Sequence, residues 1–167
     1  MKRTLALTAV LAVALAVVGY AQKPDFSGVW APDAAAAPAP PAGGGGGGGG
    51  RGGGMAGPMT VTQKADTLTI ERTMGANKIT QSFKLDGTES INKQAGRGGG
   101  AEVEVKSTAK WDGSKLTIVS KQPAADGSVR ESTQSWSLEG GNLVVESTRT
   151  GRDGAPATTK LTYKKST

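Results

Sequence analysis

The chain contains no cysteine and no histidine in its 167 residues. The absence of cysteine excludes disulfides and a thiolate nucleophile, and the absence of histidine removes the commonest general base. These two residues are also the usual ligands of zinc. Aspartate is present, but Asp66, Asp86, Asp112, Asp126 and Asp153 all fall in predicted turns, where a carboxylate bonds to nearby backbone. We therefore expect neither an enzyme nor a bound cofactor or metal.

Long apolar runs are scarce, and a single one occurs, at residues 5–18. Lys2 and Arg3 precede it and small residues follow it, which is typical of a secretory signal peptide. As a helix this run reaches about 21 Å, short of a bilayer core of about 30 Å. We interpret residues 1–21 as a signal peptide cleaved after Ala21, so that the protein is periplasmic or secreted and keeps no transmembrane segment. Because no cysteine follows the run, lipid attachment there is excluded.

Proline and glycine are concentrated in one segment. Residues 31–57 are proline, alanine or glycine except at Asp33, Arg51 and Met55. Such a composition offers little to bury, and we expect a disordered loop. Closing it costs only about 1.5 kcal/mol more than closing a five-residue loop, whereas burying Trp30 gives about 5 kcal/mol. Residues 22–30 are therefore expected to supply the first strand of a β-domain whose barrel body spans residues 58–167.

Short alternating segments fill the rest of the chain. Turn signals such as Asp86-Gly87 and Asp112-Gly113 separate them, because aspartate and glycine suit the tight turns of hairpins. The pattern predicts an all-β protein, an antiparallel up-and-down meander of about eight to ten strands that forms a closed or partly closed barrel. The expected strands are residues 26–30, 58–64, 67–72, 78–85, 88–91, 101–111, 115–121, 128–138, 142–150 and 157–164.

One fragment recurs along the chain. Residues 80–87 resemble residues 133–140, and each copy follows a Leu-Thr-Ile sequence, at 68–70 and at 116–118. A duplicated four-strand unit is one interpretation. Convergence of half-buried hairpins on similar residues is the other, and both remain open.

The connections are expected to differ in length between the two ends of the barrel. In a meander, alternate connections meet at the same end, so short turns at 65–66, 86–87, 112–114 and 139–141 gather at one end, here called the tight-turn end. Longer connections at 31–57, 73–77, 92–100, 122–127 and 151–156 gather at the other, the long-loop end. The inward positions are expected to be apolar near the tight turns and polar near the long loops. Long loops at one end of a barrel suit a ligand, although tolerated insertion explains them equally well.

This gradient of polarity predicts a binding site for an amphiphile. Its apolar tail would point toward the tight-turn end, and its carboxylate would lie among Arg130, Arg149 and Gln134. The alternative is a packed core, with both arginines in solvent or paired with Glu131 or Glu146. The candidate ligand-binding residues are Arg149, Arg130, Gln134, Gln81, Ser147, Tyr163, Trp136 and Trp111.

The start of the presumed mature chain resembles a known group. Phe26-Ser27-Gly28-Val29-Trp30 is similar to the Gly-x-Trp strand that opens lipocalins and fatty-acid-binding proteins, the calycin group, and the chain also resembles small exported lipocalin-like β-proteins of bacteria. The resemblance implies that the glycine lets the first strand cross close under the barrel while the tryptophan plugs its base. It implies Tyr163 as a lining residue, although the Arg-x-Tyr pair of fatty-acid-binding proteins is here Leu161-Thr162-Tyr163. It also implies a basic residue over the tryptophan, and Arg149 is expected there.

Two functions remain open from the sequence. The first is a non-catalytic carrier of a small amphiphilic or anionic ligand inside the barrel. The second is an envelope or extracellular interaction module with a filled core. The formal net charge of +6, which becomes +4 without Lys2 and Arg3, favours anionic envelope components as partners. Nucleic acid is not expected, because the Arg-Gly-Gly sequences at 51–53 and 97–99 lack interleaved aromatic residues.

Overall fold

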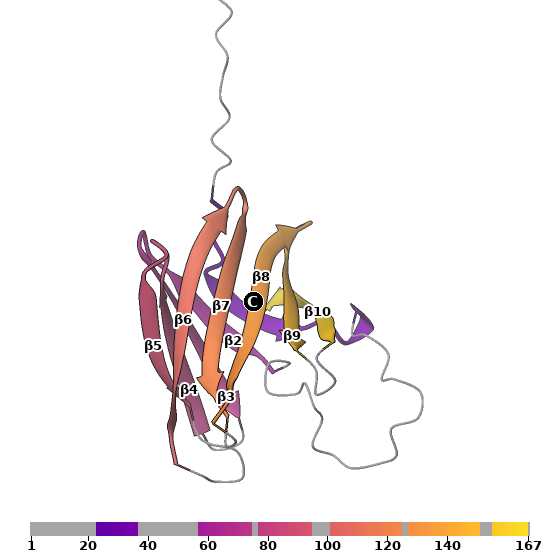
Figure 1. Ribbon diagram of the computed structural model, residues 1–167. Coiled ribbons are helices and arrows are strands. Elements are labelled where there is room, and N and C mark those ends of the chain that lie inside the picture. Colours follow the sequence, from indigo (N-terminus) through magenta and orange to yellow (C-terminus); the bar gives the residue numbers. More distant parts are fainter. Residues whose placement is uncertain are drawn as a thin grey trace, which may run out of the picture.

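The computed structural model describes residues 23–36, 57–74, 77–94, 101–124, 127–150 and 155–166. They form one sheet of ten antiparallel strands in the order β4-β3-β2-β1-β10-β9-β8-β7-β6-β5, curled into a partly closed barrel (Figure 1). The strands are β1 Gly28–Pro32, β2 Met59–Gln63, β3 Thr67–Met74, β4 Asn77–Lys84, β5 Glu89–Gln94, β6 Val103–Asp112, β7 Lys115–Pro123, β8 Val129–Glu139, β9 Asn142–Thr150 and β10 Pro156–Ser166. The predicted fold class is confirmed. The predicted signal peptide lies outside the described residues.

Two predicted connections are shorter than expected. Residues 73–77 were expected to form a long loop, but β3 and β4 pair as far as Met74 and Asn77. The expected loop at 92–100 likewise begins too early, because β5 extends to Gln94. In both places the strands continue over residues without a clear apolar alternation, so the sequence pattern predicted loops there.

The expected disorder of the segment 31–57 is wrong at the start of that segment. Its first residues belong to β1, which pairs with β10 as far as Pro32, and a short 3-10 helix, η1, follows at Ala34–Ala36. The backbone N–H of Asp33 donates to the carbonyl of Thr162, and Lys164 forms an ion pair of 3.1 Å with the Asp33 carboxylate. These contacts hold the end of β1 in place. The remainder of the expected loop, residues 37–56, lies outside the described residues.

Three aspartates occupy turns as structural acceptors and have pKa values below the ordinary value. The hydroxyl and backbone N–H of Thr88 donate to Asp86, and this bonding lowers the pKa of the Asp86 carboxyl. Hydrogen bonds from Ser27 lower the pKa of Asp25, and those from Lys164 and Ala35 lower that of Asp33. The predicted turn role is therefore confirmed at Asp86. Asp126 and Asp153 lie outside the described residues.

The lowered pKa values predict a loss of stability in acid. In the unfolded chain these three carboxyls regain ordinary pKa values near 4, so the folded state binds fewer protons. Their contribution is complete above that pKa and is lost as the pH falls through the lower folded values. We expect urea unfolding midpoints to fall between about pH 4 and pH 2. A variant carrying Asp25→Asn, Asp33→Asn and Asp86→Asn, which keeps the acceptor oxygens, should show a smaller fall; an equal fall would contradict this assignment.

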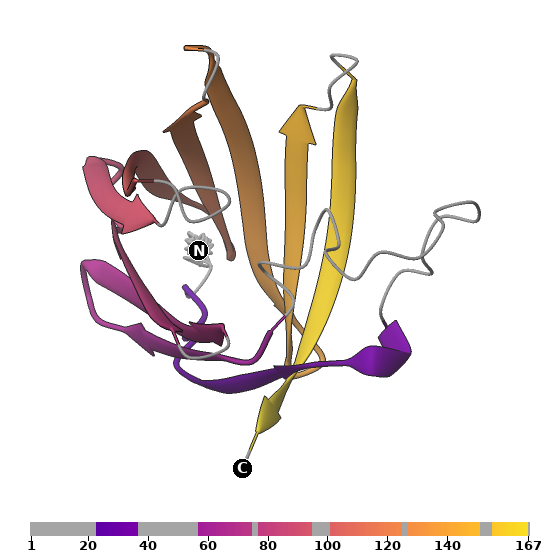
Figure 2. The same cartoon turned by 90° about the horizontal axis from the view of Figure 1, so that it is seen from below.

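The barrel is closed by side chains at one seam. Strands β4 and β5 follow each other in the chain, yet they are the two ends of the sheet order and face each other around the ring (Figure 2). The side chain of Asn92 bridges them: its Nδ2 donates to the carbonyl of Ser82 at 3.0 Å, and its Oδ1 accepts from the Ser82 N–H at 2.8 Å. The hydroxyl of Ser90 accepts from the N–H of Lys84 at 2.8 Å. The buried residues of β5 are therefore polar because they replace a missing backbone ladder.

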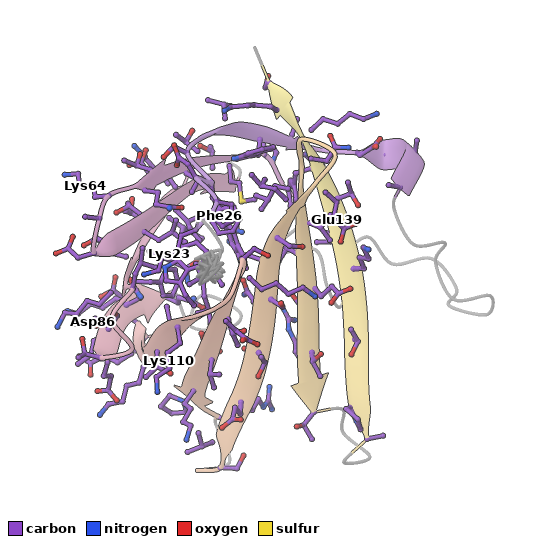
Figure 3. All side chains as sticks on the ribbon, turned by 90° about the horizontal axis from the view of Figure 1, so that it is seen from above. Lys23, Phe26, Lys64, Asp86, Lys110 and Glu139 are labelled. Atoms are coloured by element: carbon purple, nitrogen blue, oxygen red, sulfur yellow. The ribbon has the colours of Figure 1, made fainter. Side chains whose placement is uncertain are left out.

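The tight-turn end is filled by an aromatic cluster, here called the aromatic floor and formed by Phe26, Trp30, Trp111 and Trp136. The segment before β1 turns into the ring, with Phe26 inside it, Lys64 on the periphery (Figure 3) and the exposed Lys23 over the Trp111 ring. The ring of Phe26 stacks on Trp111 at 5.6 Å between centroids and meets Trp136 edge-on at 5.9 Å. The Trp30 Nε1–H donates to the Phe26 carbonyl at 2.8 Å. The predicted burial of Trp136 is confirmed.

The buried core is continuous with this floor. Its members are inward residues of β1 to β4 and β6 to β10, together with Phe26 and Leu85. They are Phe26, Trp30, Met59, Val61, Leu68, Ile70, Phe83, Leu85, Ala109, Leu116, Ile118, Trp136, Leu143, Val145 and Tyr163.

The basic residue over Trp30 is Lys165, so the expectation of Arg149 is wrong. Register decides this, because β1 pairs with β10 and places Trp30 opposite Lys165. The Lys165 Nζ lies 5.7 Å from the centroid of the Trp30 ring. Arg149 instead pairs with Ala157, near the far end of β10.

Gly28 is required where β1 begins. Its φ is +148°, a conformation that residues with a Cβ rarely adopt. A Cβ there would also lie 2.7 Å from the Lys165 Cε, displacing the side chain that covers Trp30. We expect Gly28→Ala to lower the free energy of unfolding by about 1–3 kcal/mol. Urea denaturation followed by tryptophan fluorescence measures this; Gly57→Ala, where a Cβ meets no atom within 4 Å, is the control. Equal stability of the two variants would contradict the requirement.

Candidate functional site

Polar residues line the inward face beyond the aromatic floor, as the sequence predicts. On β3, β4, β6, β8 and β9 the inward side chains change from apolar to polar in the direction of the long loops. The buried polar residues that lie on the strands are Arg72, Gln81, Ser90, Asn92, Ser107, Gln134 and Ser147. Of these, Ser90 and Asn92 serve the seam, and Ser107 shares a hydrogen bond of 2.9 Å with Ser120. Arg72, Gln81, Gln134 and Ser147 belong neither to the seam nor to that pair.

The recurring fragment produces equivalent pairings in two hairpins. Leu68 pairs with Phe83 and Ile70 with Gln81, while Leu116 pairs with Trp136 and Ile118 with Gln134. Each hairpin therefore places a buried glutamine one step beyond an aromatic residue. This equivalence holds under duplication and under convergence alike.

The structure brings several predicted site residues together on one wall. The Trp136 Nε1–H donates to the Gln134 Oε1 at 3.1 Å, and Gln134 pairs in register with Ser147 on β9. Trp111 is partly buried and belongs to the aromatic floor, so it contacts Phe26 rather than this polar group.

The two predicted arginines lie at the rim. Arg130, near the start of β8, and Arg149, near the end of β9, are both exposed. Arg149 contributes to a small hollow of about 140 Å³ at the long-loop end, which Glu131, Ser132 and Thr148 also line. Glu131, which was considered as an arginine partner, forms an ion pair of 3.5 Å with Lys121.

Arg72 is the buried arginine of the barrel, and the sequence reasoning missed it. It follows Leu68 and Ile70 on the inward face of β3, and only 6% of it is exposed. Its Nη2 donates to the sulfur of Met59 at 3.2 Å. The alternation along the strand could have revealed that Arg72 faces inward, because positions 68, 70 and 72 are two residues apart and lie on one face. The polarity gradient pointed to Arg130 and Arg149 and the resemblance to a position two residues before Tyr163, whereas the fold brings Arg72 within electrostatic reach of Tyr163.

Arg72 and Tyr163 interact electrostatically inside the barrel. Burial lowers the pKa of the Arg72 guanidinium, and Tyr163 acts in the opposite direction. Burial also raises the pKa of the Tyr163 hydroxyl, and the positive charge of Arg72 partly offsets this rise. A buried cation next to a phenol can bind an anion, because both groups donate hydrogen bonds to it.

Neither a metal site nor a membrane helix is found in the described part of the chain. No group of three acidic, cysteine or histidine residues there could hold a metal ion. The helical content of the same ranges is the three-residue η1, too short to cross a membrane.

Comparison with known proteins identifies the fold. No protein-family model matches the sequence, and no curated protein matches it. Among solved structures, human cRBP IV is similar with a TM-score of 0.52 and 19% identity over 86% of this chain and 100% of that one. A mutant of the fluorescent protein UnaG is similar with a TM-score of 0.51 and 23% identity over 85% of this chain and 96% of that one. The chain has a calycin-like barrel fold.

A third structure is similar over a smaller region. It is the zebrafish ileal bile acid-binding protein complexed with cholic acid, with 27% identity over 65% of this chain and 72% of that one, and a TM-score of 0.48.

Proposed function

We propose that this protein is a non-catalytic binder of a small amphiphile that carries an anionic group, held inside the barrel. The observation that supports this most is the buried guanidinium of Arg72, which faces the interior and interacts electrostatically with Tyr163. Burying a charged group is costly, and an anionic ligand offsets that cost. The sulfur of Met59 is a weak acceptor, which a carboxylate can replace.

The surroundings of Arg72 and Tyr163 suit an apolar tail. Met59 lies next to Arg72, and Leu161 and Val145 continue the inward face from Tyr163. A pocket with mostly apolar walls and a few polar groups is the usual form of a small-molecule site. The apolar part of the ligand would lie against these residues.

The exposed arginines are weaker anchors. A salt bridge made in solvent contributes about 0–1 kcal/mol, because water and ions screen it. Arg130 and Arg149 at the rim can attract an anion toward the barrel but contribute little to holding it. We therefore propose Arg72 and Tyr163 as the anchor, with Gln81, Gln134 and Ser147 as further lining residues.

Calorimetric titration with dodecanoate tests the proposal. We expect Arg72→Met to weaken binding by about tenfold to a hundredfold, because the buried charge that pairs with the carboxylate is removed. The control is Arg149→Met, an exposed arginine, which should change binding by less than about threefold. Equal losses in the two variants, or unchanged binding by Arg72→Met, would contradict the anchor. Absence of dodecanoate binding by the wild-type protein would argue against the function.

We also propose that the protein is exported. The support is the sequence of residues 1–21, with two basic residues before an apolar run and small residues at its end. Mass spectrometry of the protein purified from its own host should give a chain that begins at Gln22. A chain that retains residues 1–21 would contradict cleavage.

A further inference from the structure

A buried hydroxyl on β9 has no hydrogen-bond partner. Ser147 is 8% exposed, and its Oγ contacts no donor or acceptor within hydrogen-bond distance among the described residues. Its side chain follows Leu143 and Val145 on the inward face, so it points into the barrel. Buried hydroxyls nearly always have a partner, because an unmade bond costs free energy. An unpartnered hydroxyl that points into the barrel is a position where a group of the ligand can supply the missing hydrogen bond.

The residue paired with Ser147, Gln134, also favours a polar ligand group at this position. Gln134 lies opposite it on β8, and the Gln134 Oε1 accepts from the indole of Trp136. That bond fixes the orientation of the amide, because its oxygen is directed toward Trp136. Ser147 and Gln134 together form a neutral polar group on the barrel wall, whereas Arg72 provides a positive charge.

Apolar residues of β9 and β10 lie between Ser147 and the level of Tyr163. In the β9–β10 ladder, Tyr163 pairs with Leu143, Leu161 with Val145, and Thr159 with Ser147. Along the inward face, the tyrosine hydroxyl of Tyr163 is followed by an apolar stretch and then by the hydroxyl of Ser147. Ser147 therefore lies four residues along β9, about 13 Å, from the level of Tyr163.

We infer that the ligand carries, besides its anionic group, a neutral hydroxyl or carbonyl group that bonds to Ser147, about 13 Å along the barrel wall from the level of Tyr163. This inference rests on the proposed function, because the anion at Arg72 sets the position of the ligand. The ligand class is thus an amphiphile with a polar group at each end of an apolar segment, such as a terminally hydroxylated carboxylic acid.

The experiment compares plain and hydroxylated carboxylates. Dodecanoate, hexadecanoate and the terminally hydroxylated form of each are titrated into the wild-type protein, Ser147→Ala and Ser135→Ala. Ser135 is the matched control, because it lies between the inward residues Gln134 and Trp136 and so faces outward. We expect one hydroxylated acid to bind the wild type about three- to tenfold tighter than its plain form, the contribution of one hydrogen bond.

Ser147→Ala should abolish this preference and leave binding of the plain acid within about twofold, while Ser135→Ala should retain the preference. The unfolding midpoint of ligand-free Ser147→Ala should at least equal that of the wild type, since an unsatisfied hydroxyl is removed. A lower midpoint would mean that bound water satisfies Ser147, and would overturn the inference.

The possible failures are distinguishable. In one outcome, plain acids bind and Arg72→Met weakens that binding, but neither hydroxylated acid binds more tightly than its plain form. The inference is then wrong, and the proposed function stands. If no carboxylate of either kind binds, both are wrong.

Discussion

Replacing Phe26 with alanine is expected to lower the free energy of unfolding by about 3–5 kcal/mol. Phe26 is completely buried although it precedes the first strand, and its ring contacts Trp111 and Trp136. Removing it opens a cavity at the centre of the aromatic floor and ends both ring contacts. Its backbone is tied in as well, because its N–H donates to the Gln63 side chain at 3.0 Å and its carbonyl accepts from Trp30.

Urea denaturation followed by tryptophan fluorescence measures the effect. The matched control is Val29→Ala, since Val29 is apolar, lies three residues away and is 48% exposed. We expect this control to cost less than about 0.5–1 kcal/mol. A loss below about 1 kcal/mol in Phe26→Ala would mean that the segment before β1 does not fill the end of the barrel.

Replacing Asn92 with alanine is expected to lower the free energy of unfolding by about 2–4 kcal/mol. The side chain of Asn92 satisfies both the N–H and the carbonyl of Ser82, at a seam where β4 and β5 have no backbone ladder. Alanine leaves both backbone groups without these partners at a part-buried seam, and a group that loses its bond away from water costs about 1–3 kcal/mol. The barrel should open at this seam first, which hydrogen exchange of the Ser82 amide detects.

Two variants sharpen this prediction. Lys93→Ala is the control, because Lys93 is the next residue on β5 and is exposed. Asn92→Asp keeps the size of the side chain, but an ionised carboxylate can only accept, so it loses the bond to the Ser82 carbonyl. Protonation restores a donor, so the stability lost by this variant relative to the wild type should shrink as the pH falls through the carboxyl pKa. Unchanged amide exchange in Asn92→Ala would contradict the seam.

Much of the fold follows from the sequence because hairpin turns and period-two alternation are local. The positive φ of Gly87 and Gly113 is visible in the Asp-Gly pairs, and the burial of Trp136 follows from its place in an alternating strand. The positions of the strand ends were predicted less accurately. Phe26 was expected in the first strand, but Gln63, far away in the sequence, supplies the hydrogen bonds that turn it inward.

The site could be predicted only in part, because it depends on how the barrel curls. Gln81, Gln134, Ser147 and Tyr163 follow from alternation within single strands. The inward direction of Arg72 follows from alternation too, but its interaction with Tyr163 does not, because this requires β3 and β10 to face the same interior across β2 and β1. Asn92 was missed for a similar reason, since its role appears only when the two ends of the sheet meet.

The most direct test of an anion bound at Arg72 is the pKa of Tyr163, followed by the ultraviolet absorbance of tyrosinate. Without residues 1–21, which contain Tyr20, Tyr163 is the single tyrosine of the chain. In the ligand-free protein its pKa is raised by burial and partly lowered again by Arg72. A carboxylate at Arg72 cancels that opposing effect, so saturation with dodecanoate should raise the pKa of Tyr163 further. An unchanged pKa at saturation would contradict binding beside Arg72.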